Sequence, residues 1–183
     1  MHGALALPMP QAWESMARLA RQVPVGLFTP APLAPPAGWT VIRRFELFEM
    51  VHEDGASAIN RDASITVTDL SEADLPEMTV LYAATRPNRK LCQRIQKLGG
   101  FLGIRADQEL VAMAGLRMHL PGYESRGYAT ALVAALVGRI RERNERPFLT
   151  VRTDNARAVE IYRRLGFRER ARLHSTAVLW ESR

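Results

Sequence analysis

Apolar residues recur along the chain with two spacings, which predicts strands alternating with helices. Residues 11–22 carry apolar side chains at helical spacing and predict a short amphipathic helix. Residues 39–51 are rich in β-branched and aromatic side chains and predict one or two strands. The proline-dense segment 28–38 between them is expected to be extended and irregular, because proline fixes φ and removes an N–H donor.

The middle of the chain begins with a loop and continues as a strand and a helix. Residues 52–63 have turn composition and are the candidate domain boundary. Residues 64–70 predict a strand, and residues 71–85 predict a helix. Ser71 is the expected N-cap of that helix, and Asp74 follows it three residues later. This pattern places the start of the helix directly after the strand.

A hairpin is expected after a second short helix. Residues 86–100 predict the helix, closed by the glycine pair at its end. Residues 101–106 and 109–120 then predict two strands joined by a tight turn.

The last third of the chain alternates once more. The pattern predicts a helix over 127–143, a strand over 147–152, a helix over 155–167 and a closing strand over 168–180. Strands and helices in this order predict an α/β or α+β sheet covered by helices. We expect residues 1–60 to form an N-terminal extension and residues 61–183 to form the main domain.

Charge adds a weak hint of an anionic partner. The net charge is +6, and lysine occurs only at Lys90 and Lys97, so nearly all positive charge is arginine. The arginines are scattered along the chain without a block of like charges, which is typical of a solvated surface. Since no nucleic-acid-binding motif accompanies them, we expect no nucleic-acid partner.

Other functional classes find little support in the residue content. Cys92 is the only cysteine, which excludes an intramolecular disulfide and fits a reducing compartment. The four histidines show no metal-ligand spacing, so no metal site is expected. The longest apolar run is too short to cross a membrane, and the N-terminus does not resemble a signal peptide. We expect a cytoplasmic protein with no membrane partner.

One motif occupies the last predicted helix. It reads N-x-x-A-x-x-x-Y-x-x-x-G-F, at Asn155, Ala158, Tyr162, Gly166 and Phe167. At 3.6 residues per turn, Asn155 and Tyr162 lie on one face, two turns apart, with a small alanine between them. A plain amphipathic helix, with Asn155 as its cap and Tyr162 half-buried, would also produce these residues.

A second motif precedes the helix that begins near residue 127. The stretch "ESRGYATAL" ends in Gly127, Tyr128 and Ala129 at a helix start. The first amides of a helix are unpaired and carry partial positive charge, so a pyrophosphate can dock there. Gly127 would allow close backbone approach, and Arg126 could add a charged contact. Any glycine before a helix would match this motif, so its weight comes from the helix that follows.

Together the motifs resemble those of the GNAT-type N-acetyltransferases, which transfer acetyl groups from acetyl-CoA to amines. The resemblance covers roughly Ile65 to Trp180 and extends to a subgroup with an N-terminal extension. It implies a mixed, mostly antiparallel sheet flanked by helices.

The resemblance also implies roles for individual residues. The pyrophosphate of acetyl-CoA would be held by Arg126, Gly127, Tyr128, Ala129 and Thr130. Asn155 would help to hold acetyl-CoA, and Tyr162 would protonate the departing thiolate, because a phenol is protonated at neutral pH.

The sequence departs from the family's pattern in two places. Glu124 stands where the family has glutamine or arginine, and "GYES" leaves little room for the strand that precedes the phosphate loop. Either the protein carries a further segment near Glu124–Ser125, or the strand is lost. We therefore consider two functions: an N-acetyltransferase acting by direct attack of a primary amine, and a non-catalytic CoA-binding or interaction module.

For an N-acetyltransferase, the expected acceptor is a small-molecule or peptide amine whose identity the sequence does not indicate. Its pocket would be built from residues 85–100, the N-terminal extension and the final strand. The general base and the oligomeric state are open.

Overall fold

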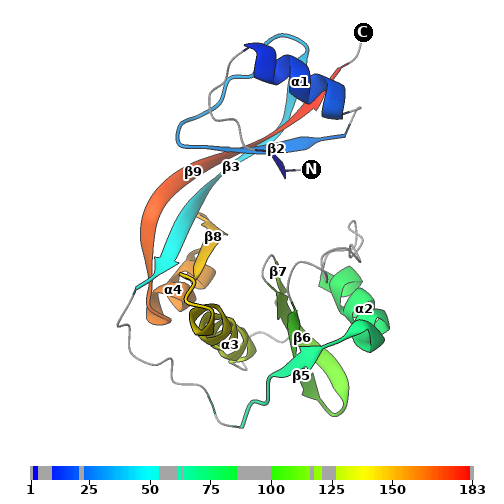
Figure 1. Cartoon of the computed structure of the whole chain (residues 1–183), viewed down its shortest axis with the longest axis vertical. Coiled ribbons are helices and arrows are strands. Elements are labelled where there is room, and N and C mark those ends of the chain that lie inside the picture. The colour runs from blue at the N-terminus through cyan, green and yellow to red at the C-terminus, as the bar shows by residue number, and fades with distance from the viewer. Residues whose placement is uncertain are drawn as a thin grey trace. The chain divides into compact units, whose positions relative to one another are not determined.

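The computed structural model describes residues 10–20, 23–53, 62, 64–85, 100–115 and 127–181, and the backbone alone of residues 2–3 and 118–120. The chain divides into two units (Figure 1). One unit comprises residues Met1–Glu53 and Phe148–Arg183, and the other comprises Asp54–Pro147. Each unit is described by itself.

The first unit is built on a pair of long antiparallel strands. Strand β3 (Trp39–His52) pairs with strand β9 (Phe167–Trp180), from Trp39 opposite Trp180 to His52 opposite Phe167. The sheet order is β1-β2-β9-β3-β8, with β1 at His2–Gly3, β2 at Val25–Thr29 and β8 at Phe148–Arg152. Only the β1–β2 pair is parallel. Strand β2, near the N-terminus, therefore pairs directly with the C-terminal strand β9.

Two helices belong to this unit. Helix α1 (Pro10–Ala20) buries Trp13 and Ala20 in a cluster with Val25, Leu27 and Val178. Helix α4 (Ala156–Arg164) buries Val159 and Tyr162. Figure 1 shows α1 and α4 near opposite ends of the β3–β9 pair.

The second unit is a four-stranded antiparallel sheet with order β4-β5-β6-β7. Its strands are β4 (Thr68–Leu70), β5 (Phe101–Ala106), β6 (Glu109–Gly115) and β7 (Met118–Leu120). Helix α2 (Leu75–Thr85) buries Met78 and Tyr82 in one core cluster of this unit. Helix α3 (Tyr128–Glu142) buries Ala131 and Leu132 in another.

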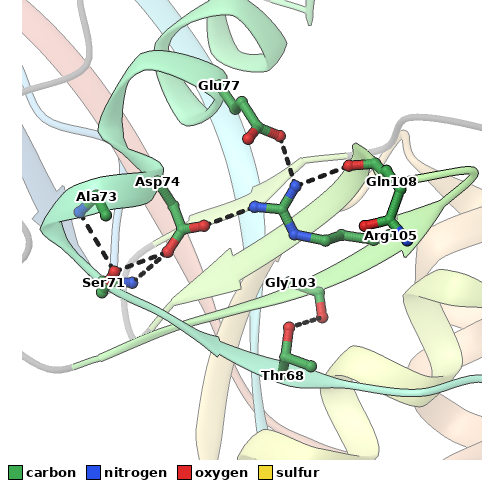
Figure 2. A network of polar contacts seen from close by, with 8 residues as sticks. All are labelled: Thr68, Ser71, Ala73, Asp74, Glu77, Gly103, Arg105 and Gln108. Atoms are coloured by element: carbon green, nitrogen blue, oxygen red, sulfur yellow. Dashed lines mark hydrogen bonds and ion pairs between the residues drawn. The ribbon is translucent and has the colours of Figure 1, made fainter.

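A polar network holds the start of α2 (Figure 2). Ser71 caps a one-turn 3₁₀ helix, η1 (Glu72–Asp74), and exchanges hydrogen bonds with Asp74 in a capping box. The Arg105 guanidinium of β5 donates to Asp74 at 2.6 Å and to Glu77 at 2.7 Å. It also donates to the Gln108 carbonyl at 2.9 Å. The N-cap prediction at Ser71 is confirmed, and the network ties the cap to the sheet.

Most of the expected elements are present at the expected places. The helices expected over 11–22, 71–85, 127–143 and 155–167 are confirmed, as are the strands over 39–51, 101–106, 147–152 and 168–180. The fold is α+β with mainly antiparallel sheets, as predicted. Residues 86–99 of the expected second helix and most of the loop expected over 52–63 lie outside the described residues, so the boundary near residue 60 stays a prediction.

Three expectations about strands were wrong. The strand expected over 64–70 forms only at Thr68–Leu70. Strand β2 runs to Thr29, inside the segment expected to be irregular, because it pairs with β9. The single strand expected over 109–120 is two strands: β6 ends at Gly115, and β7 turns back to pair with it, Gly115 opposite Met118.

The reversal after β6 bears on the strand that seemed to be missing. A short edge strand, β7, lies between β6 and α3 in the sequence. Its residues belong to the end of the strand that was expected over 109–120. Strand β7 is three residues long. Residues 121–126, including Glu124 and Arg126, lie outside the described residues. Alternation of apolar residues did not reveal the reversal, because Gly115 alone is a weak turn signal.

Candidate functional site

The N-terminus of α3 is an uncapped helix start. Gly127 is the N-cap with φ 74°, and no side chain of the described residues accepts a hydrogen bond from the first turn. The first bond within the helix runs from the Ala131 N–H to the Gly127 carbonyl, at 3.0 Å. The N–H groups of Tyr128, Ala129 and Thr130 come before Ala131 and have no acceptor within the helix, so they can donate hydrogen bonds to an anion. In contrast, Ser71 and Asn155 cap their helices with side chains.

Gly127 is required by its backbone conformation rather than by crowding. A Cβ on Gly127 would lie 3.5 Å from Ile65 Cδ1, which is ordinary contact. Its positive φ, however, belongs to the left-handed region, which costs residues with a side chain roughly 1–2 kcal/mol. A glycine here gives α3 a start without a side chain over its first amides.

The body of α3 holds this start in place within its unit. Ala131 and Leu132 pack in a buried cluster with residues of β5 and β6, among them Leu102, Ile104 and Ala112. Near the other end, Arg139 forms two hydrogen bonds with Asp69, at 2.5 and 2.6 Å. The helix is therefore anchored to its sheet along its length.

Asn155 is the N-cap of α4. Its Oδ1 accepts a hydrogen bond from the Ala158 N–H at 3.1 Å. Asn155 follows shortly after strand β8. The Thr153 N–H, between the two, donates to the Glu46 carbonyl at 3.1 Å, which fixes the chain just before the cap. The reading of Asn155 as a cap is thus confirmed. Because the cap uses Oδ1, the Nδ2 group of the exposed Asn155 amide can still donate to a ligand.

Tyr162 lies on the buried side of α4. The residue is 8% exposed, so it is more deeply buried than the half-buried side chain of a plain surface helix. Its ring meets Phe167 edge-on, with 6.0 Å between ring centroids. Burial raises the pKa of the Tyr162 phenol above its ordinary value of 10.0. The Tyr162 hydroxyl is therefore protonated across the neutral range.

His52 extends this aromatic cluster, and sequence reasoning did not single it out. The His52 ring also meets Phe167 edge-on, with 5.0 Å between ring centroids. His52 is 2% exposed, and its Nδ1 lies 3.1 Å from the Glu53 carbonyl oxygen. A lone histidine at the end of a strand carries no sequence pattern that could have revealed this contact. The pairing of β3 with β9 brings it there.

The predicted site residues fall into two groups. Asn155 and Tyr162 lie on one helix of the first unit. Gly127, Tyr128, Ala129 and Thr130 lie at one helix start in the second unit. Arg126 lies outside the described residues.

The described part of the chain holds no group of three or more histidine, cysteine, aspartate or glutamate side chains that could bind a metal ion. No helix in that part of the chain is long and apolar enough to span a membrane.

The chain was compared with known families and structures. The family model of FR47-like proteins matches residues 96–176. A crystal structure of a GNAT-family protein from Novosphingobium aromaticivorans is 32% identical, with a TM-score of 0.79. That match covers 94% of this chain and 82% of the other. No curated protein matches the sequence significantly.

More distant structures share the fold alone. A GCN5-related N-acetyltransferase from Kribbella flavida is 18% identical, with a TM-score of 0.61, over 100% of this chain and 82% of that one. A GNAT-family acetyltransferase from Colwellia psychrerythraea is 11% identical, with a TM-score of 0.60, over 92% and 72%. The order of strands and helices around α3 and α4, together with the 32% identity across nearly the whole chain, shows that this protein belongs to the GNAT acetyltransferase family.

Proposed function

We propose that the protein is an acetyl-CoA-dependent N-acetyltransferase that transfers an acetyl group to a primary amine by direct attack. The observation that carries the proposal is the uncapped start of α3 at Gly127. In a family of acetyltransferases, three backbone N–H groups that follow a glycine and have no partner among the described residues match the needs of a pyrophosphate. The acceptor in this proposal is a small-molecule or peptide amine.

In this proposal, two groups of residues would contact acetyl-CoA. Gly127, Tyr128, Ala129 and Thr130 offer backbone donors and the positive end of a helix dipole. Asn155 can offer its Nδ2 group while Oδ1 keeps the cap. Arg126 belongs to the proposed set by its place in the motif. When bound, acetyl-CoA would supply the activated acetyl group as a thioester.

Tyr162 is proposed as the acid. Its Oη holds a proton at neutral pH because burial raises the pKa. A group with a raised phenol pKa is poorly suited to act as a base, but it can give its proton to a developing thiolate. The general base stays unassigned, and Glu124, the acid nearest to the phosphate motif in sequence, lies outside the described residues.

The exposed arginines of β9 do not favour a nucleic-acid partner. Arg168 pairs with Glu53, Arg170 with Glu49 and Arg172 with Glu46 across the β3–β9 pair. These carboxylates neutralise a large part of the positive charge on the strand. A phosphate-binding face needs unpaired cations that displace counterions.

The test is a coupled assay of thiol and product. Purified protein, acetyl-CoA and each member of a panel of amino acids, polyamines, peptides and aminoglycosides are mixed, and free thiol is measured. The proposal expects thiol only when an amine is present, with the acetylated amine confirmed by mass spectrometry. Release of thiol without acetylated product, or no release with any amine, would count against it.

One observation favours a second candidate, a non-catalytic CoA-binding module. Strand β7 has three residues, so it offers little backbone for an extended ligand to pair with. This candidate predicts that acetyl-CoA raises the melting temperature while thiol release stays at background across the whole panel. Turnover with any amine removes it.

A further inference from the structure

All three tryptophans of the chain meet at one end of the β3–β9 pair. Trp13 comes from α1, Trp39 begins β3 and Trp180 ends β9. The ring centroids of Trp13 and Trp39 are 5.3 Å apart, and those of Trp39 and Trp180 are 5.4 Å apart. With Pro10, Ala17, Pro36 and Ala37, these rings line a cavity of about 560 Å³. The volume is in the range of small-molecule sites.

The wall formed by Trp180 is seated on a glycine. Gly38 has φ 88°, and a Cβ at this position would lie 2.5 Å from Trp180 Cζ3. The Gly38 carbonyl accepts a hydrogen bond from the Glu181 N–H at 3.0 Å. Trp39 and Trp180 are directly opposite each other in the sheet. The aromatic wall is therefore held by the backbone on both of its strands.

Two opposite charges line the same cavity. Glu14 and Arg18 are one helical turn apart on α1, and both are exposed. Arg18 Nη2 donates to Ser15 Oγ at a long 3.4 Å. No ion pair joins either charge to another residue in the described part of the chain. Residues four apart on a helix have Cβ atoms about 5–6 Å apart, so one small ligand can reach both.

We infer that this cavity binds an α-amino acid with a large apolar or aromatic side chain. The ammonium group would face Glu14, the carboxylate would face Arg18, and the side chain would pack on the tryptophan rings. A simple cation or a simple anion fits less well, because one of the two cavity charges would repel it. A zwitterion satisfies both charges.

The cavity is a site separate from Tyr162. Phe167, which touches Tyr162, begins β9, and Trp180 ends it. The thirteen residue steps between them correspond to roughly 40 Å of strand. An amine held by the tryptophans would not reach a reaction at Tyr162. The inferred site is thus a binding site separate from the proposed reaction, and it does not depend on the proposed activity.

Tryptophan fluorescence can test the inference, because no tryptophan lies elsewhere in the chain. The full chain is titrated with L-phenylalanine, with phenethylamine, which lacks the carboxylate, and with 3-phenylpropionate, which lacks the ammonium. We expect a saturable change with L-phenylalanine at lower concentration than with either analogue. No saturable change with L-phenylalanine, or equal affinities for all three compounds, would overturn the inference.

Charge variants sharpen the result. Glu14→Gln should weaken L-phenylalanine and phenethylamine by about threefold and leave 3-phenylpropionate unweakened, since exposed ion pairs are worth little. Arg18→Gln should show the mirror pattern. Gln11→Lys is the matched control, because it shifts the charge of α1 by the same amount as Glu14→Gln from an exposed position outside the cavity lining. Equal effects in all three variants would overturn the assigned contacts.

A filling variant tests the cavity itself. Ala37 is exposed and lines the cavity, so Ala37→Tyr adds a ring there without removing a core side chain. We expect at least tenfold weaker binding of L-phenylalanine with an unchanged melting temperature. Unchanged binding in a folded Ala37→Tyr protein would place the ligand elsewhere and overturn the inference.

Discussion

The ring of Tyr162 meets the ring of Phe167 edge-on, with 6.0 Å between centroids, where α4 passes into β9. Phe167 is 2% exposed and also contacts His52, so the tyrosine is seated against a buried aromatic cluster. This packing places Tyr162 in a region of low polarity, which raises the pKa of its phenol. The arrangement favours a tyrosine that keeps its proton until an anion develops beside it.

Removal of the Tyr162 hydroxyl should slow turnover. Tyr162→Phe keeps the ring and its contact with Phe167, so the fold should be retained. As the acid contributes to the rate, we expect kcat to fall by about 10²-fold with little change in the KM for acetyl-CoA. Steady-state kinetics measure both. Tyr82→Phe, at the buried tyrosine of α2, is the matched control and should leave kcat unchanged. Equal turnover in Tyr162→Phe and wild type would remove the acid role.

Stability should decline at high pH through Tyr162. Its folded pKa is raised, so above pH 10 the folded state holds this proton more tightly than the unfolded state does. The contribution of the protonated Tyr162 to the free energy of unfolding is fully present below pH 10, near the pKa of the phenol in the unfolded chain. It is lost as pH rises through the pKa of Tyr162 in the folded protein. Thermal melts between pH 8 and 11 should show a fall that is smaller in Tyr162→Phe. Identical pH profiles of the two proteins would contradict the burial effect.

Two glycines of α3 should respond in opposite ways to alanine. Gly127→Ala must adopt a positive φ and should destabilise by about 1–2 kcal/mol. A Cβ at Gly138 meets nothing within 4 Å, so Gly138→Ala should stabilise by about 1 kcal/mol. Denaturant melts measure both.

The same pair separates stability from binding. If the start of α3 holds acetyl-CoA, the KM for acetyl-CoA should rise in Gly127→Ala and stay unchanged in Gly138→Ala. A parallel change of KM in both variants would argue against the phosphate site.

Asn155→Asp distinguishes a cap from a ligand contact. Aspartate caps helices as well as asparagine does, so stability should stay within about 0.5 kcal/mol, whereas Asn155→Ala should cost about 1 kcal/mol. Aspartate lacks the Nδ2 donor and adds a negative charge. If Asn155 helps to hold acetyl-CoA, the KM should rise severalfold in the aspartate variant. An unchanged KM would leave Asn155 with its capping role alone.

The cap of η1 should contribute to the stability of the second unit. Ser71→Ala removes the acceptor of the Ala73 N–H and one partner of Asp74, and should cost about 1 kcal/mol. Ser71→Thr keeps a hydroxyl and should lose less. Chemical denaturation measures the difference. If the alanine and threonine variants were equally stable, the hydroxyl would not be the stabilising group.

Local patterns determined the elements and their starts. Each helix start depends on neighbours a few residues away, so its position could be read from the sequence. This holds for Ser71 with Asp74, for Gly127 before an apolar helix and for Asn155 before α4. The C-terminal motif indicated the family for the same reason: its residues lie within one short segment, from the N-cap of α4 at Asn155 to the start of β9 at Phe167. The alternative role considered for Asn155, capping of its own helix, also depends on neighbouring residues, and the structure shows that cap.

Long-range pairing decided what spacing does not encode. The reversal that makes β7 depends on hydrogen bonds to β6, and β2 extends to Thr29 because β9 pairs with it. His52 reaches Tyr162's aromatic cluster through the β3–β9 register. The tryptophan cavity joins residues 13, 39 and 180, whose closeness comes from sheet pairing and from the packing of α1. Such contacts depend on which strands meet, and no local preference of the chain specifies that choice.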